Sequence, residues 1–288
     1  MKNNFKIDFM CIGAAKAGTT WLADRLREYS SVCVSEPKEV DYFNHYIAFS
    51  KTLNKNHNKP FSWYKKRFQH CKDESIKGEL STDYLTDKKA PLLIKKFFPN
   101  IKLIICLRNP IDGAYSDYLM RKSYMKREHR TFMDAIRQNS YTEPRLYHKH
   151  LKKYLKHFRK DQLLIIWSED IKNNPKKVME GVLKFLNVNE DIKVKNLGEK
   201  SHAAKTVRFR FIIVLMNSIS RLLVSLKLSK VSVFLKKIGI KGLVMNLNTS
   251  PIVYPKMDIE ARRYLRKKFE KDIKKLEILL KKNLSHWR

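Results

Sequence analysis

Acidic residues are scarce in this chain. Of its 288 residues, 28 are Asp or Glu and 61 are Lys or Arg, which leaves a formal net charge of +33. Residues 201–257 contain ten basic side chains and no acidic one. A surplus of this size indicates a negatively charged partner or substrate, such as a nucleic acid, a membrane surface, or a phosphorylated or sulfated small molecule.

Long hydrophobic runs are missing as well. The longest uninterrupted apolar run, residues 211–216, is far below the roughly 20 residues of a membrane-spanning helix. Apolar residues still make up 43% of the chain, which is enough for a hydrophobic core and excludes a wholly disordered protein. Because the sequence has no internal repeat and no low-complexity linker, we expect one soluble or peripheral domain over residues 1–288.

The four cysteines, Cys11, Cys33, Cys71 and Cys106, lack the spacing of a metal-binding motif. Three of them lie in apolar runs, where cysteine behaves as a small hydrophobic residue. We therefore expect reduced cysteines, no metal site and a cytoplasmic protein.

Predicted strands alternate with predicted helices along the chain. Short apolar runs typical of buried parallel strands occur at residues 6–12, 32–34, 101–107 and 163–167. Helical patterns occur at residues 20–28, 112–123, 145–158, 176–186 and 258–280, and Asn174-Pro175 is a typical helix start. The alternation predicts an α/β fold, a doubly wound parallel sheet flanked by helices.

A basic amphipathic helical insertion is predicted at residues 209–250, inside the acid-free stretch. Apolar residues recur there at helical spacing, with Arg210, Arg221 and Lys227 among them. One interpretation is a helix packed on the core with a solvated basic face. The other is contact of residues 209–241 with a polyanion or with the inner surface of the membrane.

The strongest local motif is Gly13-Ala14-Ala15-Lys16-Ala17-Gly18-Thr19-Thr20, between a predicted strand and a predicted helix. A glycine turn at this junction directs backbone N–H groups toward an anion, and the helix N-terminus adds the positive end of its dipole. In the loop that binds nucleoside triphosphates, a lysine follows the second glycine. Here Thr19 stands at that position and Lys16 lies inside the loop, which argues against an ATPase, a GTPase or a kinase.

A second signal follows the predicted strand at residues 101–107. Arg108 stands directly after this strand, and Ser116 lies on the next predicted helix. An arginine at the carboxyl end of a strand and a hydroxyl on the neighbouring helix can converge on one phosphate group.

Together, the two segments resemble the sulfotransferases that use 3′-phosphoadenosine 5′-phosphosulfate. The chain is most similar to the heparan sulfate N- and 3-O-sulfotransferases and their bacterial relatives, and the similarity extends through residues 37–44, 61–64, 78–85 and 163–186. The resemblance implies a P-loop-type fold and sulfuryl transfer without a metal, with adenosine 3′,5′-bisphosphate as the product of the donor.

The resemblance also implies roles for individual residues. Glu39 would be the general base, and Lys16 would stabilise the leaving group. The donor would be bound by Lys16, Ala17, Gly18, Thr19, Thr20, Trp21, Arg108 and Ser116, and by Lys205 and Arg208 of a basic loop. Acceptor contacts would come from Lys38, Asp41 and Tyr84.

Some alternatives remain open for these residues. Glu36 and Asp41 are rival candidates for the base, and the residues alone also allow Glu39 to be a surface carboxylate paired with Lys38. The chain departs from the resembled pattern at Leu80, where a lysine is common, and at Gly113, where an arginine often stands.

The implied acceptor is a saccharide or a glycolipid, and the sequence does not distinguish sulfation of a hydroxyl from sulfation of an amine. Two other classes compete with this hypothesis. A P-loop small-molecule kinase would bind ATP and magnesium, and a basic nucleic-acid-binding protein would explain the charge but not the glycine loop. We expect no nucleic acid partner.

Overall fold

The computed structural model describes residues 5–48, 50–73, 75–125, 127–191, 205–207, 249–251 and 255–288. The chain divides into two compact units, one of residues 1–118, 130–201 and 257–288 and one of residues 119–129 and 202–256. Nearly all of the predicted insertion at residues 209–250 lies outside the described residues, and the single-domain assignment stays a prediction.

The first unit is built on a five-stranded sheet with the strand order β2-β3-β1-β4-β5. All four strand pairs are parallel, which confirms the predicted α/β sheet. The strands are β1 (Phe9–Gly13), β2 (Val32–Val34), β3 (Ile76–Leu80), β4 (Lys102–Leu107) and β5 (Leu163–Trp167).

Strand β3 is absent from the sequence prediction. Its sequence, IKGEL, interrupts the apolar pattern with a lysine, a glycine and a glutamate. Gly78 is required because the ring of Phe9 on β1 lies against it, and a Cβ at this position would be 2.0 Å from that ring. Glu79 is fully buried, so β3 carries a carboxyl group into the core of the sheet.

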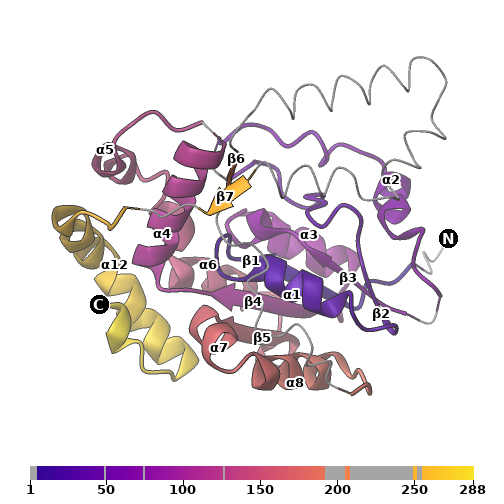
Figure 1. Ribbon diagram of the computed structural model, residues 1–288. Helices are drawn as coiled ribbons and strands as arrows, with labels where there is room; N and C mark the ends of the chain where they lie inside the picture. Colours follow the sequence, from indigo (N-terminus) through magenta and orange to yellow (C-terminus); the bar gives the residue numbers. More distant parts are fainter. Residues whose placement is uncertain are drawn as a thin grey trace, which may run out of the picture. The chain divides into compact units, whose positions relative to one another are not determined.

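Helices of the first unit flank the sheet (Figure 1). Asn174 caps α8 by accepting a hydrogen bond from the N–H of Lys177 at 3.2 Å, as the Asn-Pro sequence predicts. Among the described helices, none is both long and apolar enough to cross a membrane. The helices are α1 (Thr19–Leu26), α2 (Phe61–Lys65), α3 (Ala90–Phe97), α4 (Pro110–Leu119), α5 (Phe132–Arg137), α6 (Tyr147–Tyr154), α7 (Ser168–Asn173), α8 (Pro175–Leu186) and α12 (Ile259–Leu280).

Short helical turns connect several of these elements. Those used below are η1 (Lys66–Phe68), η2 (Thr82–Leu85) and η4 (Glu143–Arg145). A short strand pair, β6 (Lys205–Val207) and β7 (Thr249–Pro251), belongs to the second unit.

Two of the four cysteines form a disulfide, so the expectation that all are reduced is wrong. Cys33 on β2 is bonded to Cys71, which follows η1, with a Cα–Cα distance of 5.6 Å and a sequence separation of 38 residues. Sequence spacing carries no signal for such a pair, because only the fold brings the two residues together. Cys11 and Cys106 are free and buried. The cytoplasmic location stays a prediction.

Reduction of this disulfide is expected to destabilise the protein. The bond joins two cysteines separated by 38 positions, and loop-closure entropy for a loop of that length corresponds to about 4 kcal/mol of unfolding free energy. Thermal unfolding with and without dithiothreitol measures the effect. A Cys33→Ala/Cys71→Ala double variant should melt at one temperature under both conditions, whereas a wild-type protein that is equally indifferent to the reductant contradicts the prediction.

Candidate functional site

A tight loop joins β1 to α1. Within it, Lys16 has φ 64° and Gly18 has φ 103°, both in the left-handed region. Only glycine suits position 18, because a Cβ there would also lie 2.6 Å from the side chain of Ile171. Among the described residues no side chain caps the start of α1, so its first N–H groups point out of the helix in the arrangement that binds anions.

Two arginines hold this loop by its carbonyl groups. Arg108, which directly follows β4, donates from Nη1 to the carbonyl oxygen of Lys16 at 3.2 Å. Arg145 of η4 donates to the carbonyl oxygen of Ala15. The structure therefore places the guanidinium of Arg108 against the backbone of Lys16, and the predicted sharing of one ligand by the two side chains stays a prediction.

Arg145 is a site residue that the sequence analysis missed. Its side chain is 1% exposed, and Nη2 lies 3.5 Å from the carboxylate of Asp117. Its guanidinium also lies against Gly113, where a Cβ would be 3.5 Å from the Cζ atom. The chain thus places a guanidinium beside position 113 although the residue there is glycine. Only tertiary structure reveals this, since η4 is remote in sequence from both the loop and α4.

The other side of the site is the segment that follows β2. The ammonium of Lys38 lies 2.8 Å from Glu39 Oε1 and 3.4 Å from the hydroxyl of Thr19. The hydroxyl of Thr82 donates to Glu39 Oε2 at 3.0 Å. The Lys38–Glu39 ion pair is what a surface carboxylate would form, but the second contact of Lys38 brings Glu39 beside the first turn of α1.

A buried carboxyl group lies under this segment. Glu79 on β3 accepts hydrogen bonds from the hydroxyls of Tyr64 at 2.5 Å, of Ser81 at 2.6 Å and of Tyr84. Burial raises the pKa of Glu79 to about 7, although the three hydroxyls oppose the shift. Tyr84 is itself fully buried, and its hydroxyl is used inside the protein. This placement argues against the direct acceptor contact predicted for Tyr84.

Asp41 lies two residues beyond Glu39 with φ 51°. Its Oδ1 atom is buried and has no hydrogen-bond partner among the described residues. Burial raises the pKa of Asp41 to about 8, and the neighbouring carboxylates of Asp83 and Glu39 add to the increase. Asp41 is therefore protonated at neutral pH in the folded protein.

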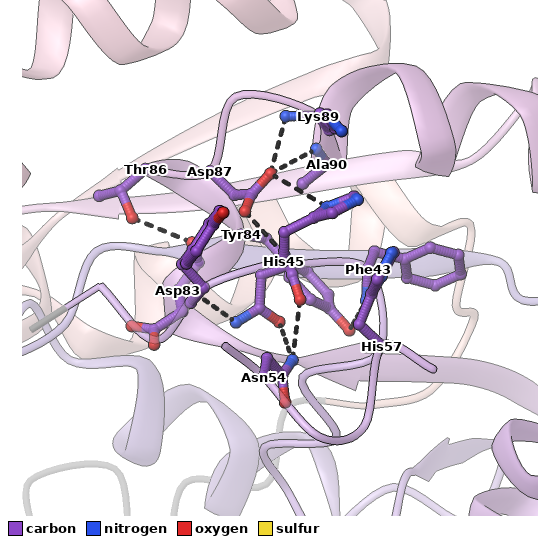
Figure 2. A network of polar contacts seen from close by, with 12 residues as sticks. Phe43, His45, Asn54, His57, Asp83, Tyr84, Thr86, Asp87, Lys89 and Ala90 are labelled. Atoms are coloured by element: carbon purple, nitrogen blue, oxygen red, sulfur yellow. Dashed lines mark hydrogen bonds and ion pairs between the residues drawn. The ribbon is translucent and has the colours of Figure 1, made fainter. Parts of the chain in front are cut away.

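Carboxylates also hold the loop that follows. Asp87 accepts from the N–H of His45 at 2.8 Å, and Asp83 accepts from the N–H of Ala48 at 3.0 Å. Asn54 donates to the carbonyl oxygen of Asn44 at 2.8 Å. Figure 2 shows His45 and Asn54 within this network, beside the turn that contains Asp83 and Asp87. The contacts fix the course of the chain between Asp41 and α2.

The raised pKa of Asp41 predicts a pH-dependent stability. The folded protein retains a proton that the unfolded chain releases at its ordinary pKa of 3.8, so the free energy of unfolding falls as the pH rises from about 4 to about 8. Asp41→Asn, which keeps a residue tolerant of positive φ, should melt several degrees above wild type at pH 9 and at the same temperature near pH 4. Asp73→Asn, at an exposed position, should follow the wild-type pH profile. An Asp41→Asn variant that melts in parallel with wild type across this range contradicts the assignment.

The other residues predicted to bind the donor differ in how deeply they are buried. Ala17, Thr19 and Trp21 are buried, whereas Thr20 and Ser116 on α4 are half-buried. Lys205 begins β6 in the second unit, and Arg208 lies outside the described residues. The roles of these residues stay predictions.

Comparisons with known proteins point to one family. A family model for the sulfotransferase domain matches residues 6–210. Human heparan sulfate glucosamine 3-O-sulfotransferase 5 is 29% identical over 198 residues, covering 65% of this chain and 55% of that protein. Human bifunctional heparan sulfate N-deacetylase/N-sulfotransferase 2 is 28% identical over 207 residues, covering 62% of this chain and 22% of that protein. The matches thus span about half or less of these relatives.

Solved structures agree on the fold. A sulfotransferase from Alicyclobacillus acidocaldarius is 23% identical and superposes with a TM-score of 0.69 over 99% of both chains. A mouse sulfotransferase solved with PAP is 15% identical, with a TM-score of 0.50 over 69% of this chain and 65% of that one.

Proposed function

The chain belongs to the sulfotransferase domain family, and from this we propose that it transfers a sulfuryl group from 3′-phosphoadenosine 5′-phosphosulfate to a carbohydrate acceptor. The observation that carries the proposal is the meeting of cationic groups at the start of α1. Arg108 bonds to the backbone of Lys16, and Lys38 links Glu39 to Thr19. Such a site suits a donor that carries two phosphate groups, and Glu39 would be the base that activates the acceptor.

The donor would lie along the loop between β1 and α1. The N–H groups of residues 17–20, together with the hydroxyls of Thr19 and Thr20, would hold the 5′-phosphate. Arg108 spends one donor on the carbonyl of Lys16 and retains further N–H groups, which with Ser116 would hold the 3′-phosphate. Trp21, Lys205 and Arg208 are proposed as further contacts.

Sulfuryl transfer resembles phosphoryl transfer, with in-line attack and charge spread over the equatorial oxygens, so that positioning and electrostatics dominate. The acceptor oxygen or nitrogen forms a bond to sulfur while the bond from sulfur to the bridging phosphate oxygen breaks. Glu39 takes the proton of the acceptor, and Lys16 stabilises the negative charge on the departing phosphate. Lys38 would stabilise the group in transfer, because its ammonium lies between Glu39 and Thr19.

The acceptor class rests on the relatives, whose names identify heparan sulfate as their substrate. We propose a saccharide or glycolipid acceptor, sulfated on a hydroxyl or an amine, and Asp41 as a residue close to it. A cytoplasmic location and membrane contact through residues 209–241 are kept as further proposals.

Isothermal titration calorimetry distinguishes this function from the two competing classes, a P-loop small-molecule kinase and a nucleic-acid-binding protein. We expect adenosine 3′,5′-bisphosphate to bind at least tenfold more tightly than ATP with magnesium or a short oligonucleotide. Incubation with radiolabelled donor and a panel of polysaccharides and glycolipids should then label a carbohydrate. Tight binding of ATP with magnesium, and none of the bisphosphate, overturns the proposal.

A further inference from the structure

Four consecutive backbone N–H groups follow Glu39, those of residues 40–43. The described chain forms neither helix nor strand there, and three of the four residues are buried, so these groups need acceptors other than a regular backbone ladder. Two hydroxyls supply them. Ser81 accepts from the N–H groups of Val40 and Asp41, each at 3.0 Å. Tyr84 accepts from those of Tyr42 at 2.8 Å and Phe43 at 3.3 Å.

Glu79 determines which way the two hydroxyls face. A hydroxyl has one proton and two lone pairs, whereas a carboxylate that is ionised, as Glu79 is above its pKa of about 7, only accepts. Ser81 and Tyr84 both donate their proton to Glu79 Oε1. Their lone pairs are therefore left for the N–H groups of residues 40–43.

The same turn also contacts the side chain of Glu39. Thr82 lies between Ser81 and Tyr84 and donates to Glu39 Oε2. Glu79 itself is fully buried on β3, which pairs with β2 on one side and with β1 on the other. The backbone and the carboxylate of the Glu39 segment are thus both held from the end of one central strand.

Resting on the proposed function, we propose that Glu79 is a positioning residue for sulfuryl transfer. Through Ser81 and Tyr84 it fixes the backbone of residues 40–43, and so it fixes the carboxylate of Glu39 relative to the loop that would hold the donor. The effect on rate can be large, because a misplacement of about 1 Å in a reacting group can cost about 100-fold.

The chain offers a matched pair of variants to test this role. Tyr64 and Tyr84 are both fully buried, both donate to Glu79, and both rings lie near Phe43, with centroids 5.3 and 5.8 Å away. Of these two tyrosines, the one whose hydroxyl accepts from N–H groups of residues 40–43 among the described residues is Tyr84, which accepts from Tyr42 and Phe43. Tyr84→Phe should lower kcat about tenfold or more with KM for the acceptor little changed, whereas Tyr64→Phe should stay within about threefold of wild type.

A second measurement addresses Glu79 directly. Ser81→Ala should show the same loss of kcat. If Tyr84→Phe does not fold, Ser81→Ala is compared with Tyr64→Phe in its place. Glu79→Gln should also lower kcat while leaving the affinity for adenosine 3′,5′-bisphosphate unchanged. In the Ser81→Ala/Tyr84→Phe double variant, adding Glu79→Gln should change kcat by less than about twofold, because its effect passes through those hydroxyls.

Three results overturn the positioning role. The first is equal kcat for Tyr64→Phe and Tyr84→Phe, and the second is a raised KM with unchanged kcat in Tyr84→Phe. The third is a loss of kcat from Glu79→Gln that is as large in the Ser81→Ala/Tyr84→Phe double variant as in the wild-type protein. Each of them leaves the proposed function standing, provided that the wild-type protein transfers the sulfuryl group. A wild-type protein that binds no bisphosphate and transfers nothing refutes the proposed function itself.

Discussion

Replacing Lys16 by alanine is expected to lower kcat by about 10²–10³-fold while the protein stays folded. Lys16 lies in the loop between β1 and α1, and its carbonyl oxygen is already bonded to Arg108. The backbone contact survives the substitution, so the variant removes mainly the ammonium group. The loss therefore measures how much charge this group stabilises on the departing phosphate.

Backbone strain needs its own control, because Lys16 has φ 64° and alanine tolerates that region poorly. Lys281, which directly follows α12, is exposed and has φ 52°. Lys281→Ala should destabilise the protein to a similar extent and leave kcat unchanged. Normal turnover in Lys16→Ala would defeat the role assigned to its ammonium group.

Glu39→Gln is expected to lower kcat by about 10²–10⁴-fold, the usual contribution of a general base. The amide keeps the size of the side chain, and its oxygen can still accept from Thr82, but the ion pair with Lys38 is lost, so the decrease in kcat reports the missing carboxylate. The affinity for adenosine 3′,5′-bisphosphate should not change, because the predicted donor contacts lie elsewhere. Rapid-quench measurement of a single turnover isolates the chemical step.

Glu36 provides the matched control. It lies three residues earlier in the same segment and is exposed, so Glu36→Gln should retain wild-type turnover. If Glu39→Gln transfers the sulfuryl group at the wild-type rate, the assignment of Glu39 as the base is wrong.

Local signals in the sequence were sufficient for much of the fold. Strands β2 and β5 have the predicted bounds, and the glycine loop lies between β1 and α1 as predicted, because apolar runs, glycines and helix starts act over a few neighbouring residues. Strand β3 was missed because a buried glutamate contradicts the rule that charged residues stay outside. That glutamate is tolerated because three hydroxyls satisfy it, and no local pattern reveals such partners.

In the candidate site, too, local sequence signals indicate some of the residues, and only the fold reveals the others. Arg108 contacts the backbone carbonyl of Lys16, whereas the predicted sharing of a ligand by the two side chains stays a prediction. The contacts of Arg145 and Thr82 are visible only in the structure, since they join elements far apart in the sequence. The catalytic and binding roles of these residues stay predictions until the variants are measured.

The Cys33–Cys71 bond has a practical consequence for handling the protein. It turns residues 33–71 into a closed ring that contains Glu39 and the exposed lysines Lys51 and Lys55. Trypsin cleavage at one of these lysines opens the ring without releasing a fragment, so the nicked protein retains its apparent mass on a non-reducing gel and separates into two pieces only under reductant. Purity judged on non-reducing gels would therefore overlook damage to the segment that carries the proposed base.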